Sequence, residues 1–77
     1  MKQINPEILN TLKKLETVLD TSNDFYDKVH MISQFYMDEF GKDLSIDHAQ
    51  YIMENFDAFV GFAHYNNRFP LNDFDNM

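Results

Sequence analysis

Apolar residues recur every three or four positions between residues 46 and 63, and this spacing constrains the fold more than any other feature. The members of the repeat are Ile46, Ala49, Met53, Phe56, Val60 and Ala63. They occupy positions a and d of nearly three heptads, so they would form one face of an α-helix. We therefore expect a helix over residues 46–65 that begins after Ser45, a residue type that often caps helices.

Two earlier segments show the same helical spacing, over about residues 6–19 and 23–40. Pro6 stands where proline is tolerated in a first helical turn, and Gly41 stands where a left-handed C-cap is usual. No segment alternates apolar and polar residues long enough to predict a strand. The sequence thus predicts an all-α fold, a small antiparallel bundle of three helices, as a single domain over residues 1–77.

The third helix has a weak point that leaves a four-helix alternative open. Asn55 could end this helix and cap a separate fourth one. Gly61 adds a further cost, because glycine in a helix interior is about 1 kcal/mol less favourable than alanine. A bundle of three helices, or of four if the chain breaks near Asn55, is therefore expected.

The tail, residues 66–77, cannot continue the last helix past Pro70, because proline lacks the backbone N–H that a helix needs. The tail nevertheless carries three large apolar residues, Phe69, Leu71 and Phe74. These are too apolar for a freely solvated end, so we expect the tail to be partly folded back.

Charge limits the classes of partner. Thirteen Asp and Glu residues against six Lys and Arg give a net charge of −7. Residues 43–77 carry Arg68 alone against six acidic residues. Such a chain would repel nucleic-acid phosphates and anionic lipid head groups, so we expect neither direct nucleic-acid binding nor membrane binding. A helix-turn-helix interpretation fails for the same reason, and a charged partner should be basic.

The N-terminus lacks the apolar core of a signal peptide, and the longest apolar run is far shorter than the roughly 20 residues that span a bilayer. The chain has no cysteine, so it can form no disulfide or thiolate metal site. We expect a cytoplasmic protein, in the host cytoplasm if the gene belongs to a phage.

Catalytic and metal-binding patterns are missing from the sequence. The histidines, His30, His48 and His64, form no H-x-x-x-H or H-E-x-x-H pair. No serine lies in a G-x-S-x-G motif, and no acidic cluster has the spacing of a calcium loop. We therefore expect a protein that is not an enzyme and that uses no cofactor and no metal.

One flank of the expected third helix carries carboxylates without a cation, namely Asp47, Glu54 and Asp57. On a continuous helix, Glu54 and Asp57 would be about 4.5 Å apart along the axis, and Asp47 and Glu54 about 10.5 Å apart. Such a row could imitate the phosphates of a nucleic acid. An ordinary solvated helix side would have the same composition, so both interpretations stay open.

The outward face of the same helix holds three aromatic residues, Tyr51, Phe62 and Tyr65. Aromatic side chains opposite a core seam need a cover, which the tail, a second copy of the chain or a different protein could provide. Aromatic anchors among polar neighbours are also typical of binding hot spots. We assign these residues to an aromatic face and the three carboxylates to an acidic flank, both as candidate partner-binding groups.

Two functions fit these features. The first is a non-enzymatic acidic inhibitor that occupies the basic surface of a nucleic-acid-binding protein. By composition alone, this interpretation is analogous to inhibitors of anti-restriction or anti-CRISPR type, which would suggest a phage or mobile-element protein. The alternative is a homo-oligomeric helical regulatory or structural protein, for which a homodimer is the simplest form.

Overall fold

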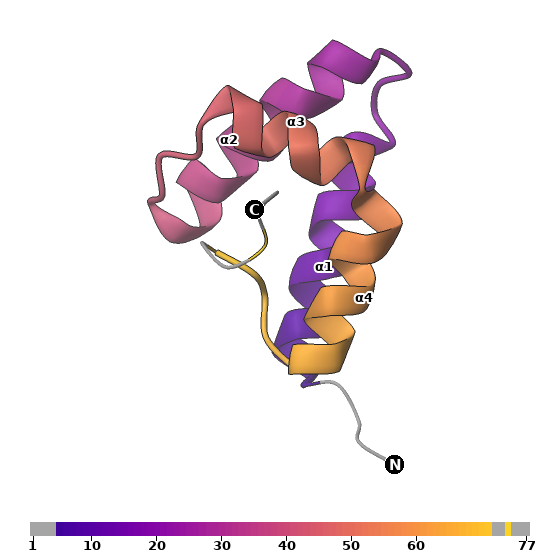
Figure 1. Cartoon of the computed structure of the whole chain (residues 1–77), viewed down its shortest axis with the longest axis vertical. Helices are drawn as coiled ribbons and strands as arrows, with labels where there is room; N and C mark the ends of the chain where they lie inside the picture. Colours follow the sequence, from indigo (N-terminus) through magenta and orange to yellow (C-terminus); the bar gives the residue numbers. More distant parts are fainter. Residues whose placement is uncertain (1–4, 72–73, 75–77) are drawn as a thin grey trace.

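The computed structural model describes residues 5–71 and residue 74, and these residues form four helices and no strand. The helices are α1 (Pro6–Leu19), α2 (Phe25–Phe40), α3 (Ile46–Glu54) and α4 (Phe56–Asn66). Figure 1 shows α2 beside α3 and α1 beside α4, so that the helices form two pairs inclined to one another. The predicted all-α class is confirmed.

Local capping signals explain where α1 and α2 begin and end. The side chain of Asn5 accepts a hydrogen bond from the Glu7 backbone N–H (2.9 Å), directly before Pro6 at the first helical position. Asp24 caps α2 in the same way, and Gly41 ends α2 in the left-handed conformation, with φ 63°. Because these signals lie within a few residues of each helix end, the sequence places both helices to within two residues.

The expected continuous helix over residues 46–65 is wrong, and the four-helix alternative is what the structure has. Asn55 leaves the helical conformation, with φ −124° and ψ 38°, and its side-chain amide donates to the Tyr51 carbonyl (2.9 Å). The helical ladder resumes where the Phe59 N–H donates to the Asn55 carbonyl (2.9 Å). Asn55 therefore separates α3 from α4, although its side chain makes no capping hydrogen bond to α4.

The buried face of α3 and α4 is also rotated from the predicted one. Ile52 and Phe59, which are not among the predicted a and d positions, are 1% and 0% exposed, whereas Ile46, which is one of those positions, is 43% exposed. The rings of Phe69 and Phe74 pack on Phe59, with centroids 5.5 and 5.3 Å away. Residues after α4 thus extend the core toward Ile52 and Phe59, which a helix taken alone cannot reveal.

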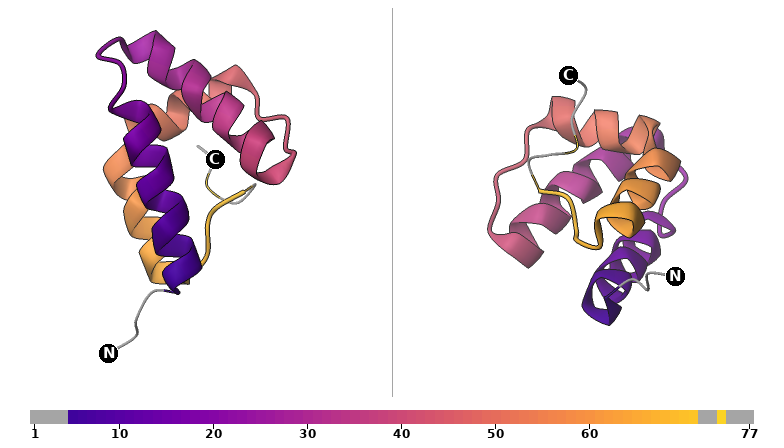
Figure 2. Two further views of the ribbon diagram at one scale, coloured as in Figure 1. Left: turned by 180° about the vertical axis from the view of Figure 1, so that it is seen from behind. Right: turned by 60° about the horizontal axis from the view of Figure 1, so that its bottom comes forward.

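The segment after α4 turns back between the two helix pairs (Figures 1 and 2). Phe69 is 8% exposed and belongs to the hydrophobic core. Its ring contacts four others from α2 and α4, those of Phe35, Tyr36, Phe40 and Phe59. The hydroxyl of Tyr36 donates a buried hydrogen bond to the Pro70 carbonyl (2.7 Å).

A further hydrogen bond connects residues at the two ends of the helical region. The backbone N–H of Asn5 donates to the side-chain oxygen of Asn67 (2.6 Å), and Asn67 adopts the left-handed conformation that ends α4. The start of α1 therefore lies at the end of α4. In the parts of the chain that the structure describes, no helix has both the length and the apolar character needed to cross a membrane.

Candidate functional site

The three carboxylates of the predicted acidic flank are exposed but lie on two helices. Asp47 and Glu54 are on α3, seven residues apart and hence on nearly the same side of that helix. Asp57 is in the first turn of α4, beyond the break at Asn55. The axial spacing of Glu54 and Asp57 expected for a continuous helix therefore does not apply.

Glu54 and Asp57 both lie at the junction between α3 and α4. Both line a shallow hollow of about 410 Å³, together with Met53, Asn55, Phe56 and Ala58. Within the described residues, none of the three carboxylates of the acidic flank forms an ion pair. The side-chain amide of Gln50 donates to Glu54 (3.2 Å), and this is a neutral partner. The junction thus offers unpaired negative charge beside apolar side chains.

Local structure accounts for part of this charge. Asp47 and Asp57 each lie in the first turn of a helix, where a carboxylate interacts favourably with the positive end of the helix dipole. Glu54 lies at the last residue of α3, where that interaction is unfavourable. Its position is therefore the one that the helix dipole does not explain.

The aromatic face is divided. Tyr51 on α3 and Phe62 on α4 are both partly buried, and each contacts the ring of Phe74 with centroids 5.5 Å apart. Tyr65 is 82% exposed and lies elsewhere on α4, at an open hollow shared with Gly61, His64 and Asn66. Phe74 therefore brings Tyr51 and Phe62 together and leaves Tyr65 outside the group.

His48 also belongs to this cluster. Its Nε2 atom makes a short hydrogen bond to the backbone carbonyl of Phe74, and its backbone N–H donates to the Ser45 side chain that caps α3 (3.1 Å). Sequence reasoning assigned no binding role to His48 or Phe74. Two features of the sequence could have indicated these roles. The tail is apolar, and His48 lies three residues before Tyr51, about one helical turn away.

The remaining histidines, His30 and His64, are exposed. Over residues 5–71 and 74, no group of three or more His, Asp or Glu side chains is placed to hold a metal ion.

Apart from these hollows, a groove with a volume of about 660 Å³ lies between α1 and α2. Val18 and Phe35 contribute apolar surface to it, while Lys14 and Glu39 form an ion pair across the two helices (3.2 Å). This pair is largely exposed, and such pairs contribute little to stability. The groove contains both signs of charge, so its lining does not select one class of ligand.

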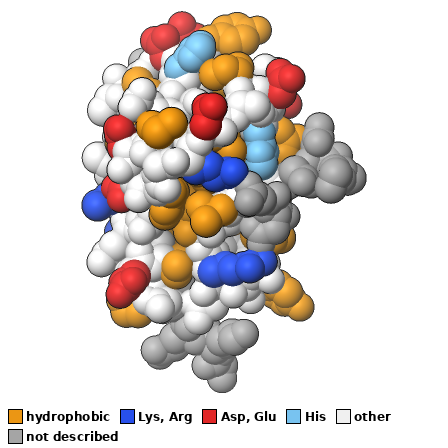
Figure 3. Space-filling model, turned by 90° about the vertical axis from the view of Figure 1, so that its left-hand side faces the viewer, with side chains coloured by type: hydrophobic (Ala, Val, Ile, Leu, Met, Phe, Trp, Pro, Cys, Tyr) orange, Lys and Arg blue, Asp and Glu red, His pale blue; other side chains and the backbone are white. Residues whose placement is uncertain are grey.

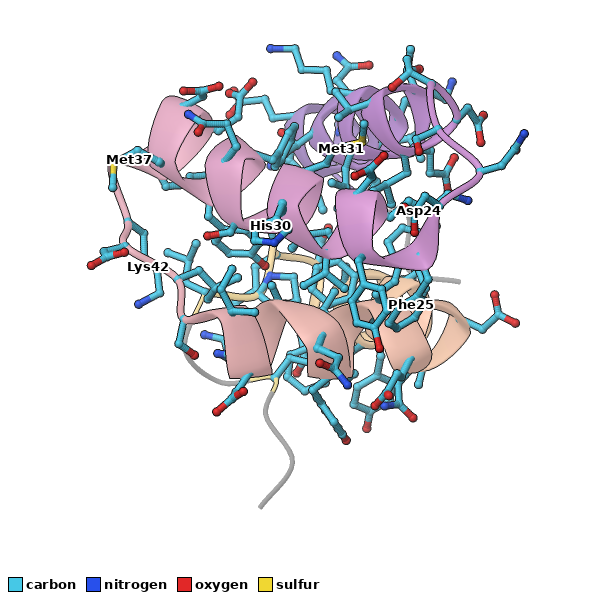
Figure 4. All side chains as sticks on the ribbon, turned by 90° about the horizontal axis from the view of Figure 1, so that it is seen from above. Asp24, Phe25, His30, Met31, Met37 and Lys42 are labelled. Atoms are coloured by element: carbon cyan, nitrogen blue, oxygen red, sulfur yellow. The ribbon has the colours of Figure 1, made fainter. Side chains whose placement is uncertain are left out.

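The surface views show how charge and apolar groups are distributed. On the face in Figure 3, acidic side chains are scattered among apolar, basic and histidine side chains and do not form one patch. Figure 4 shows Phe25 and Met37 near opposite ends of α2. They are 36% and 46% exposed, so single apolar side chains are accessible at both ends of this helix.

No protein-family model matches the chain, and neither the curated proteins nor the solved structures include a significant match. Its function must therefore be inferred from its own residues.

Proposed function

We propose that this protein is a non-enzymatic binding module that inhibits a nucleic-acid-binding protein by occupying its basic surface. The observation that carries the proposal is the acidic flank, whose exposed carboxylates, Asp47, Glu54 and Asp57, lack ion-pair partners within the described residues. The proposed partner is a protein with Lys and Arg on its binding surface. The analogy with inhibitors of anti-restriction or anti-CRISPR type remains one of composition.

The chemistry of the two groups supports this proposal. Carboxylates accept charge-assisted hydrogen bonds from Arg and Lys, often two at a time from a guanidinium. Partly buried aromatic side chains, here Tyr51 and Phe62, are the kind of apolar anchor that such contacts surround in binding hot spots. In the proposed arrangement, the helices form an antiparallel bundle and the tail is partly folded back.

The proposal is tested with a variant that removes the three charges but keeps the side-chain sizes: Asp47→Asn, Glu54→Gln and Asp57→Asn. A partner captured by the wild-type protein should bind this variant more weakly, and its affinity should depend less on salt. Both effects follow because charge pairs across an interface are screened by ions. Binding is measured by calorimetry over a series of NaCl concentrations.

A matched control variant removes three exposed carboxylates, one from α1, one from its C-cap and one from α2: Glu16→Gln, Asp20→Asn and Asp38→Asn. It has the same net charge as the first variant, so a general charge effect would weaken both equally. An unchanged affinity and salt slope in the acidic-flank variant would rule out electrostatic mimicry by this flank.

The alternative is a homo-oligomeric regulatory or structural protein, and one observation favours it. Tyr65 is 82% exposed beside Gly61, at which an added Cβ would meet no atom within 4 Å. Neither the exposed Tyr65 ring nor the open space at Gly61 is needed within one molecule. A second copy packed on α4 could contact the ring and fill the space. Analytical ultracentrifugation at micromolar concentration distinguishes the two proposals, because a monomer would contradict this one.

A further inference from the structure

Phe74 lies in a site built from α3 and α4, which we call the Phe74 slot and define by His48, Tyr51, Phe59 and Phe62. Its ring contacts the three aromatic rings at centroid distances of 5.3 to 5.5 Å. It meets Phe59 and Phe62 edge to face, at 85° and 68°, and Tyr51 at 39°. Edge-to-face and tilted geometries are those that aromatic pairs prefer.

The fourth member of the slot recognises backbone rather than a ring. The Phe74 carbonyl can only accept a hydrogen bond, so His48 must carry a hydrogen on Nε2 to donate to it. The slot therefore binds two features at once, an aromatic side chain and the carbonyl of the same residue. Both features would be present in any extended segment that contains an aromatic residue.

The chain after α4 is attached at two points that differ in depth. At the first, Phe69 is 8% exposed among core rings, and the Pro70 carbonyl is bonded by the buried Tyr36 hydroxyl. At the second, Phe74 and its hydrogen-bond donor His48 are only partly buried. The second attachment can therefore open while the first stays in place.

We propose that Phe74 is an intramolecular latch: it covers the Phe74 slot until an aromatic side chain of a basic partner segment replaces it. This inference rests on the function proposed above and specifies how the partner is recognised. Tyr51 and Phe62, which we assigned to the partner-binding face, are available only when the latch is open. Binding is thus coupled to release of Phe74 from the slot.

Charge beside the slot indicates the chemistry of the replacing segment. Asp47 lies four residues before Tyr51, so the two side chains are neighbours on one face of α3. Asp47 is exposed and has no ion-pair partner within the described residues. A Lys or Arg next to the incoming aromatic residue would be placed to meet it.

The test uses a capped peptide derived from the last seven residues, Leu-Asn-Asn-Phe-Asn-Asn-Met, in which asparagine replaces both aspartates to remove repulsion. It is titrated into the full-length wild-type protein and into Phe74→Ala, and binding is followed by NMR shifts of the Tyr51 and Phe62 rings. Because apparent affinity scales with the open fraction, a latch closed in about 90% of molecules makes wild-type binding about tenfold weaker than in the variant.

Matched controls separate the latch from a general loss of packing. Phe25→Ala makes the same chemical change at another partly exposed site and should bind the peptide as weakly as the wild type. A peptide with alanine in place of phenylalanine should not bind Phe74→Ala. Equal peptide affinity in the wild type and Phe74→Ala, or no binding to a Phe74→Ala protein that retains wild-type helical circular dichroism, would overturn the latch.

If Phe74→Ala loses its helical signal, Phe74→Leu provides the second test, because it removes the aromatic ring, keeps an apolar side chain and leaves the slot residues unchanged. It should bind the peptide more tightly than the wild type does, and unchanged affinity would contradict the latch.

Partner chemistry is tested separately with a peptide that carries lysine on both sides of the phenylalanine. Phe74→Ala should bind it more tightly than the neutral peptide at low salt, and adding Asp47→Asn should remove that gain. If both peptides bind equally, the basic character of the partner segment is wrong. The neutral-peptide test contains no ion pair, so the latch can fail while electrostatic recognition holds, and the reverse is also possible.

Discussion

Tyr36 is a core residue whose hydroxyl bonds to the segment that follows α4. Its side chain is completely buried, and its hydroxyl donates to the Pro70 carbonyl over 2.7 Å. A buried carbonyl that loses its donor retains the cost of having left water, which is about 1 to 3 kcal/mol. The bond also fixes the first attachment of the segment that leads to Phe74.

Tyr36→Phe should therefore destabilise the fold by about 1 to 3 kcal/mol, because it deletes the donor and keeps the ring. Urea denaturation followed by circular dichroism measures the change. The matched control is Tyr26→Phe, since Tyr26 is 67% exposed and should tolerate the loss of its hydroxyl. Equal stability of the wild type and Tyr36→Phe would show that the bond to Pro70 does not contribute.

At the scale of the helices, the two glycines have opposite roles. Gly41 ends α2 with φ 63°, a conformation that residues with a Cβ adopt at a cost of about 1 to 2 kcal/mol. Gly61 lies inside α4, where glycine is about 1 kcal/mol less favourable than alanine. An added Cβ would meet no atom within 4 Å at either position, so backbone preference alone determines the outcome.

We expect Gly41→Ala to lower the free energy of unfolding by about 1 kcal/mol and Gly61→Ala to raise it by a similar amount. Each substitution serves as the control for the other, because both add one methyl group in open space. Thermal unfolding should show shifts of about 4 to 8 °C in opposite directions for a domain of this size. Shifts of the same sign would contradict this account of the two helices.

How far each helix could be predicted depended on where its determinants lie. α1 and α2 have theirs at their own ends, in Asn5, Pro6 and Gly41, and the sequence displays them directly. The break at Asn55 was visible only as an alternative, since asparagine disfavours a helix by less than 1 kcal/mol and packing decides the result. The buried face of α4 depends on Phe69 and Phe74, which are distant from its first turn in sequence.

For the whole molecule, the candidate site also has features that depend on single residues and features that depend on contacts between distant parts of the chain. The exposure of Asp47, Glu54 and Asp57 follows from their polarity and was expected, whereas their distribution over two helices depends on the break. Tyr51 and Phe62 share a contact only because Phe74 lies against both. The periodicity of apolar residues describes one helix at a time, so it could not predict a cluster that forms only when the segment after α4 packs against α3 and α4.

Net charge should act on the stability of the whole molecule. The radius of gyration is 11.9 Å, and the net charge is −7. The Debye length is about 30 Å at 0.01 M salt and about 10 Å at 0.1 M, so charges repel across the whole molecule only at low salt. The only ion pair within the described residues, Lys14 with Glu39, is exposed, and losing it to screening should matter little.

We therefore expect the melting temperature to rise as NaCl increases from 0.01 to about 0.3 M, because screening relieves self-repulsion in the compact state. Asp47→Asn, Glu54→Gln and Asp57→Asn together should make this rise smaller, since three negative charges are removed. The variant with Glu16→Gln, Asp20→Asn and Asp38→Asn should show a similar reduction, because net charge and not position sets the effect. Calorimetry at fixed pH measures all three proteins, and a melting temperature that falls with salt would mean that attractive pairs outweigh the net repulsion. If the two variants respond equally to salt, the positions of the removed charges matter for partner binding alone, where the first variant should differ from the second.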